Sequence, residues 1–123
     1  MILKNSLYTI VSSAVGDGKG DFAIRFNPEH FIYKAHFPGE PITPGVCIMQ
    51  IAKELLEEMT TASLHLICVK NIKFLKIISP NEVADVVYSL SKVTREGDEI
   101  KVQVSVTAGE TVYAKLSLIC QER

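Results

Sequence analysis

A run of proline and glycine at residues 36–46 constrains this chain more than any other part of its sequence. The run reads HFPGEPITPGV and contains three prolines and two glycines. Proline fixes the backbone φ angle, so the run predicts a rigid loop. Apolar residues at helical spacing follow at once, and the loop is therefore expected to lead directly into a helix.

That helix is predicted over residues 45–60, where apolar residues recur three and four positions apart. Thr43 and Pro44 suit its start, since proline is favoured in the first helical turn. Its apolar side is broad, formed by Val46, Ile48, Met49, Ile51, Leu55, Leu56 and Met59. A helix this apolar is expected to be wrapped by other structure rather than to lie on a surface.

The rest of the chain reads as strands separated by short turns. The expected strands cover residues 6–14, 21–26, 64–78, 83–94, 100–107 and 112–120, with turns at 16–20, 79–82, 95–98 and 108–110. Two strands thus precede the helix and four follow it. A twisted antiparallel sheet around one apolar helix accounts for this order, which predicts an α+β fold in a single domain over residues 1–123.

Composition and charge exclude several classes of function. The chain has 123 residues and a net charge of -1, with 47% hydrophobic and 22% charged residues, so nothing favours binding to nucleic acid or to a membrane. No apolar run approaches the ~18–20 residues of a membrane span, and the N-terminus does not resemble a signal peptide. Cys47, Cys68 and Cys120 lack paired spacing. We expect reduced, buried thiols, no metal site and a cytoplasmic location.

Residues 36–46 resemble the HFPGxPxxPGV signature of the hot-dog-fold 3-hydroxyacyl-[acyl-carrier-protein] dehydratases. Residues 72–82, IKFLKIISPNE, resemble the third strand and turn of that family. The resemblance implies a hot-dog dimer with active sites at the interface, where one subunit supplies a histidine and the helix of its neighbour supplies an acid. It also implies reversible loss of water from a 3-hydroxyacyl thioester, without a metal or an organic cofactor.

The resemblance assigns roles to individual residues. His36 takes the place of the catalytic histidine, and its titration near neutral pH suits a base; a histidine that holds the loop together is the alternative. Gly45 takes the place of the glycine whose backbone N–H faces the thioester oxygen at the helix start. Phe37, Pro44 and Val46 are expected to bind substrate beside it.

The acidic residue of the family lies fourteen positions after the histidine, and here that position is Gln50. An amide hydrogen-bonds a hydroxyl group but cannot protonate it. Glu54 stands one turn further on, where the family commonly has glutamine. Residues four apart share a helix face, so Glu54 is a candidate for the acid. The alternative is that Glu54 belongs, with Lys53, Glu57 and Glu58, to a solvated helix end.

Three functions therefore remain open. The first is a dehydratase of fatty-acid or polyene-type synthesis, acting on a thioester of acyl carrier protein or coenzyme A as a homodimer or higher homo-oligomer. The second is a subunit with little activity alone, completed by a related hot-dog chain in a heterodimer. The third is a thioesterase, against which the HFPG-type loop counts. A basic rim for an acidic carrier protein, or simply a solvated face, is expected from Lys34, Lys70, Lys73, Lys76 and Arg95.

Overall fold

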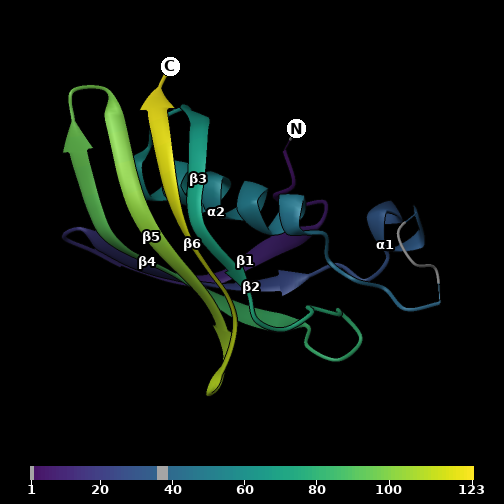
Figure 1. Cartoon of the computed structure of the whole chain (residues 1–123). Coiled ribbons are helices and arrows are strands. Elements are labelled where there is room, and N and C mark those ends of the chain that lie inside the picture. Colours follow the sequence, from purple (N-terminus) through teal and green to yellow (C-terminus); the bar gives the residue numbers. More distant parts are fainter. Residues whose placement is uncertain (1, 36–38) are drawn as a thin grey trace.

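The computed structural model describes residues 2–35 and 39–123 and contains one curved sheet and two helices (Figure 1). The elements in chain order are β1 (Tyr8–Gly16), β2 (Lys19–Phe26), α1 (Phe31–Ala35), α2 (Gly45–Thr60), β3 (Leu64–Phe74), β4 (Asp85–Glu96), β5 (Glu99–Ala108) and β6 (Thr111–Glu122). The strands pair in the order β1-β2-β4-β5-β6-β3, and every pairing is antiparallel. Strand β3 is therefore an edge strand.

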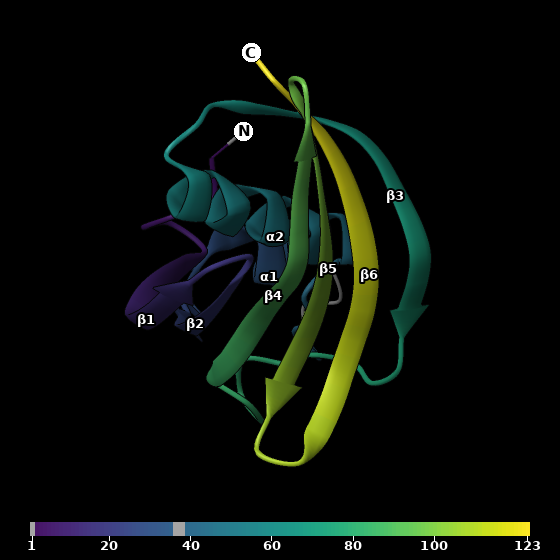
Figure 2. The ribbon, with the colours of Figure 1, turned by 90° about the vertical axis from the view of Figure 1, so that its left-hand side faces the viewer.

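The sheet curls around α2, which Figure 2 shows lying on its concave side. This is the hot-dog fold, and the prediction of an antiparallel sheet around an apolar helix is confirmed. Alternation on the strands explains the packing, since every second residue of β5 is buried, namely Ile100, Val102, Val104 and Val106. These side chains belong to one core with Ile51 and Leu55 of α2. Each such side chain contributes about 1.5–3 kcal/mol through burial.

Three hairpin turns depend on glycine. Gly18, Gly97 and Gly109 have φ angles of 69°, 64° and 59°, in the left-handed region that glycine adopts without strain. They connect β1 to β2, β4 to β5 and β5 to β6, each within a turn region that the sequence predicted.

Two local features differ from the sequence prediction. Helix α1 was not expected; it begins just after His30, whose Nδ1 accepts the N–H of Ile32 at 3.1 Å. The strand predicted over residues 64–78 ends at Phe74. It ends there because Leu75 and Lys76 both donate to the carbonyl oxygen of Tyr113, at 2.8 and 3.2 Å, instead of continuing the ladder.

The cysteines are free thiols, but only two of them are buried as predicted. Cys47 and Cys120 lie in the core, whereas Cys68 is half-buried on β3. Burial raises the pKa of Cys120 to about 11 and also raises the pKa of Cys47. Within residues 2–35 and 39–123, no helix is long and apolar enough to cross a membrane.

Candidate active site

The first turn of α2 contains backbone N–H groups that precede its first intrahelical hydrogen bonds. The carbonyl oxygen of Pro44 accepts from the N–H groups of Cys47 and Ile48, at 3.0 and 3.1 Å, so the intrahelical bonds begin with those residues. The N–H groups of Gly45 and Val46 come before them in the first turn, where intrahelical acceptors are lacking. Together with the helix dipole, these groups favour an oxygen that carries negative charge.

An apolar groove of about 510 Å³ opens beside this helix start. It is lined by Ile42, Thr43, Gly45, Ile48, Phe74, Leu75, Lys76, Ile77 and Ile78. The N–H of Thr43 donates to the carbonyl oxygen of Ile78 at 2.8 Å, which ties the proline-rich loop to the segment after β3. Phe74, Leu75 and Ile77 are exposed in the single chain. An exposed apolar patch of this kind is typical of a binding surface.

The ring of Phe74 packs directly on Gly45. A Cβ atom at position 45 would lie only 2.9 Å from Cζ and 3.0 Å from Cε2 of Phe74, so a larger residue there would displace the ring. The sequence indicated Phe74 as an apolar strand residue within the segment 72–82 that resembles the third strand of the family, and gave it no role in the site. Its contact with Gly45 joins residues far apart in the chain, and no local pattern predicts it.

Glu54 is buried, contrary to the solvated helix end that was one alternative. Its side chain reaches the N-terminal segment, where Oε2 accepts from the backbone N–H of Leu3 and Oε1 from that of Lys4, both at 2.8 Å. Oε1 also accepts from the hydroxyl of Tyr8 at 3.0 Å. Lys53 is buried too, at 9% exposure against 6% for Glu54. Glu54 is buried because the N-terminal segment covers this part of α2.

Gln50 and Glu54 share one face of α2, as their spacing predicted, and the structure shows that their side chains interact. Nε2 of Gln50 donates to Oε2 of Glu54 at 2.8 Å. Each oxygen of Glu54 therefore accepts two hydrogen bonds, which accounts for the four acceptor positions of a carboxylate. Because a carboxylate only accepts, the amide nitrogen of Gln50 faces Glu54 and its Oε1 points elsewhere.

Tyr8 is fixed as a donor in this cluster. Burial, and next the charge of Glu54, raise the pKa of Tyr8 well above the usual value for tyrosine. Its hydroxyl group therefore keeps its proton at any physiological pH. The cluster of Leu3, Lys4, Tyr8, Gln50 and Glu54 leaves no acceptor of Glu54 directed toward the groove.

The other residues that the sequence predicted for the site lie in different parts of the chain. His36 and Phe37 lie outside the described residues; in the chain they directly follow Ala35, the last residue of α1. Pro44 precedes the first helical residue, and Val46 is exposed in the first turn of α2. Arg95 does not join the lysines of the predicted basic rim. It lies at the end of β4 and forms an ion pair with Glu122.

A family model described as ApeI dehydratase, of the ApeI-like family, matches residues 12–115. The chain belongs to the ApeI-like dehydratase family. Among curated dehydratases, the 3-hydroxyacyl-[acyl-carrier-protein] dehydratase FabZ of Wolbachia pipientis wMel is 26% identical over 110 residues, which cover 81% of this chain and 73% of that protein. Family membership thus agrees with the resemblance carried by residues 36–46.

Solved structures show the same fold. The dehydratase heterocomplex ApeI:P from Xenorhabdus doucetiae matches with a TM-score of 0.72 and 10% identity, over 91% of this chain and 96% of that one. A hypothetical thioesterase from Streptococcus pneumoniae TIGR4, solved with coenzyme A, matches with a TM-score of 0.62 and 12% identity. The match covers 94% of this chain and 85% of that one. At these identities the similarity establishes the fold alone, and dehydratases and thioesterases share it.

Proposed function

We propose that this chain takes part in the dehydration of 3-hydroxyacyl thioesters to trans-2-enoyl thioesters. The supporting observation is the start of α2, where Gly45 lies beside an apolar groove of about 510 Å³ in a member of a dehydratase family. The groove suits an acyl chain, whereas the backbone N–H groups suit a thioester oxygen that gains negative charge.

The proposed reaction needs a base, an oxyanion donor and an acid. His36 removes a proton from C2, and the electron pair moves toward the thioester carbonyl, whose oxygen is held by the N–H of Gly45. The pair then forms the double bond between C2 and C3. The hydroxyl group on C3 leaves at that point and takes a proton from the acid to give water.

We further propose that the acid belongs to another chain, which makes this protein one subunit of a heterodimer. The amide of Gln50 has no proton of suitable acidity to give. The acceptors of Glu54 are all occupied by the N-terminal segment, Tyr8 and Gln50. A dehydratase of this fold is known as a heterocomplex, ApeI:P from Xenorhabdus doucetiae.

Strand β3 supports the proposal of a second hot-dog chain. It is the edge strand next to β6, and Ile67 and Ile72 on it are exposed. An edge strand with exposed apolar residues is suited to pair with another strand. We propose that the partner chain continues the sheet across β3, so that its helix lies beside α2.

The experiment is a dehydration assay of the intact chain, alone and mixed with a related hot-dog chain that has glutamate at the position of Gln50. We expect little activity alone and strong activity in the mixture, on 3-hydroxyacyl thioesters of either carrier protein or coenzyme A. His36→Ala should lower the rate of the mixture by about 10²–10⁴-fold. Lys19→Ala, at an exposed residue of β2 away from the proposed interface at β3, is the control and should leave the rate unchanged. Activity of the His36→Ala mixture that equals that of the wild-type mixture and exceeds that of the partner chain alone would show that the base has been misassigned.

The contact between Gly45 and Phe74 gives a separate test of the groove. In Gly45→Ala, the added methyl group should displace the Phe74 ring and lower kcat/KM about tenfold or more, as expected for one surplus methyl group in an apolar pocket. The double variant Gly45→Ala/Phe74→Ala should recover part of that loss. Gly16→Ala is the control, because a Cβ atom there would have no atom of the described residues within 4 Å. A normal kcat/KM in Gly45→Ala would place the acyl chain outside this groove.

A further inference from the structure

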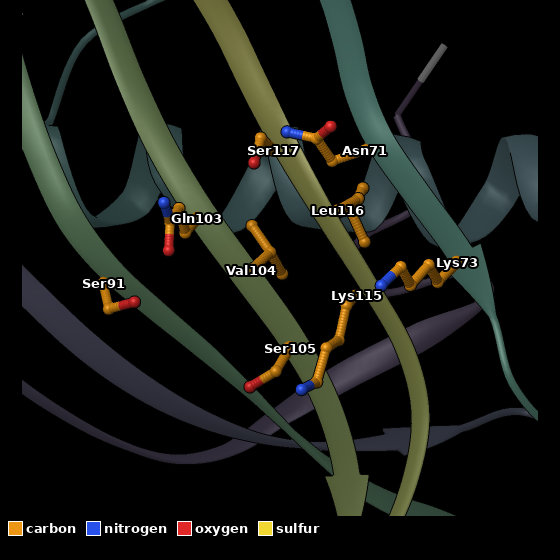
Figure 3. Close-up of a pocket in the computed structure, with 9 residues that line it drawn as sticks. All are labelled: Asn71, Lys73, Ser91, Gln103, Val104, Ser105, Lys115, Leu116 and Ser117. Carbon is orange, nitrogen blue, oxygen red and sulfur yellow. The ribbon is translucent and has the colours of Figure 1, made fainter.

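The convex face of the sheet carries a second depression, of about 410 Å³. Figure 3 shows it from outside, with α2 behind the sheet and the polar lining side chains on the near side of β3, β4, β5 and β6. The polar members of the lining are Asn71, Lys73, Ser91, Gln103, Ser105, Lys115 and Ser117. This depression lies across the sheet from the core, and its described lining residues are all different from those of the apolar groove.

Strand register explains how these side chains come together. Ser105 of β5 lies opposite Lys115 of β6, and Lys115 lies opposite Lys73 of β3. The next row of side chains lies two residues further along the strands. In this row, Ser91 of β4 lies opposite Gln103 of β5, and Gln103 lies opposite Ser117 of β6. Because cross-strand partners point to the same face, two polar rows run side by side over four strands.

Lys73 and Lys115 occupy directly opposite positions on the neighbouring strands β3 and β6. Like charges directly opposite each other on neighbouring strands destabilise a sheet. Within the described residues, Lys73 and Lys115 form no ion pair. Among the described residues that line the depression there is no aspartate or glutamate. Positive charge is thus concentrated here although the chain as a whole has a net charge of -1.

We propose that this depression is a binding site for a phosphate monoester. Such a group carries about 1.5–2 negative charges near pH 7 and has three acceptor oxygens, which matches two ammonium groups; a carboxylate compensates only one of them. The serine hydroxyls and the amides of Asn71 and Gln103 supply neutral hydrogen bonds for the rest of a polar ligand. The volume lies within the range of small-molecule sites.

The phosphate monoester has two natural sources: a small phosphorylated metabolite, or the 3′-phosphate of coenzyme A. Glycerol 3-phosphate represents the first source. Coenzyme A and dephospho-coenzyme A, which differ by that one phosphate, test the second. In either case the site is separate from the proposed acyl groove, so its occupation is measured as binding and not as catalysis.

The experiment compares the thermal midpoint of the intact chain in chloride, acetate, phosphate and glycerol 3-phosphate at matched ionic strength. We expect the two phosphates to raise the midpoint above its value in chloride, and acetate to leave it unchanged. Lys73→Ala and Lys115→Ala should each weaken phosphate binding at least tenfold. Lys19→Ala, at an exposed lysine of β2, is the control and should bind phosphate normally.

The same variants give a second readout without any added anion. At low ionic strength, Lys73→Ala should raise the thermal midpoint because it removes the repulsion by Lys115, whereas Lys19→Ala should not. Equal midpoints of the wild-type chain in phosphate and chloride would overturn the proposal, as would an undiminished phosphate shift in both Lys73→Ala and Lys115→Ala. A stronger shift by coenzyme A than by dephospho-coenzyme A would identify the nucleotide phosphate as the ligand.

Discussion

Gln50→Glu is expected to raise the dehydration rate of the isolated chain by about 10²–10⁴-fold, the usual contribution of a general acid. The substitution changes an amide into a carboxyl group of nearly the same size at the position that the family uses for its acid. In a dimer of the variant, each helix would then provide the proton that the amide of Gln50 cannot. The gain should appear without any partner chain.

The neighbouring Glu54 makes this variant unusual. Nε2 of Gln50 lies 2.8 Å from Oε2 of Glu54, so the introduced carboxyl group would face an existing carboxylate at hydrogen-bond distance. Two carboxylates this close do not both ionise, and the pair keeps one shared proton. We therefore expect the pair to remain protonated at a pH where an isolated carboxyl group has lost its proton, and the hydrogen bond to Glu54 to be preserved.

A pH–rate profile separates this effect from a simple gain of acid. The control is the double variant Gln50→Glu/Glu54→Gln, in which the introduced carboxyl group faces an amide and shares no proton. Both variants should gain activity, but the single variant should keep its rate to higher pH. The alternative outcome is that neither variant is more active than the wild-type chain, although both bind the substrate. In that case a missing acid does not limit the dehydration rate of this protein.

The sequence predicted well those parts of the fold that depend on local spacing. Alternation at Ile100, Val102, Val104 and Val106 identifies the buried side of β5, and it does so because residues two apart on a strand face the same way. Gly18 and Gly97 mark turns because their positive φ angles suit glycine. The helical pattern after Pro44 similarly gave both bounds of α2.

The candidate site depends instead on contacts between distant parts of the chain, which spacing does not reveal. Glu54 is polar and lies beside Lys53 and Glu57, so the sequence alone is compatible with a solvated helix end. It is buried because the backbone of Leu3, 51 residues away, returns to it. Phe74 likewise reaches Gly45 only because the loop before α2 is tied to the segment after β3.

Glu54→Ala is expected to lower the free energy of unfolding by about 3–5 kcal/mol. The carboxylate accepts hydrogen bonds from Leu3, Lys4, Tyr8 and Gln50. Its removal leaves these donors without their acceptor, and each buried donor left unsatisfied costs about 1–3 kcal/mol. The total is smaller than four such penalties because Lys4 and Gln50 are only partly buried and gain access to water.

Chemical denaturation with urea measures this change, with two variants for comparison. Glu58→Ala removes an exposed carboxylate one turn further along α2 that pairs with the side chain of Lys4, and it should cost less than about 1 kcal/mol. Tyr8→Phe removes one of the donors, leaves the carboxylate three others, and should cost about 1 kcal/mol. The expected order of stability is therefore Glu58→Ala, then Tyr8→Phe, then Glu54→Ala as the least stable.

Hydrogen exchange shows whether the lost stability comes from the N-terminal segment. In the wild-type chain, the amide protons of Leu3 and Lys4 should exchange slowly, since both donate to Glu54 at 2.8 Å. In Glu54→Ala they should exchange as fast as in an unfolded chain, while amides in the middle of β5 stay protected. If Leu3 and Lys4 remain protected in the variant, the segment is held by the packing of Leu3, Leu7 and Tyr8 in the core. The carboxylate of Glu54 would then contribute little to holding this segment in place.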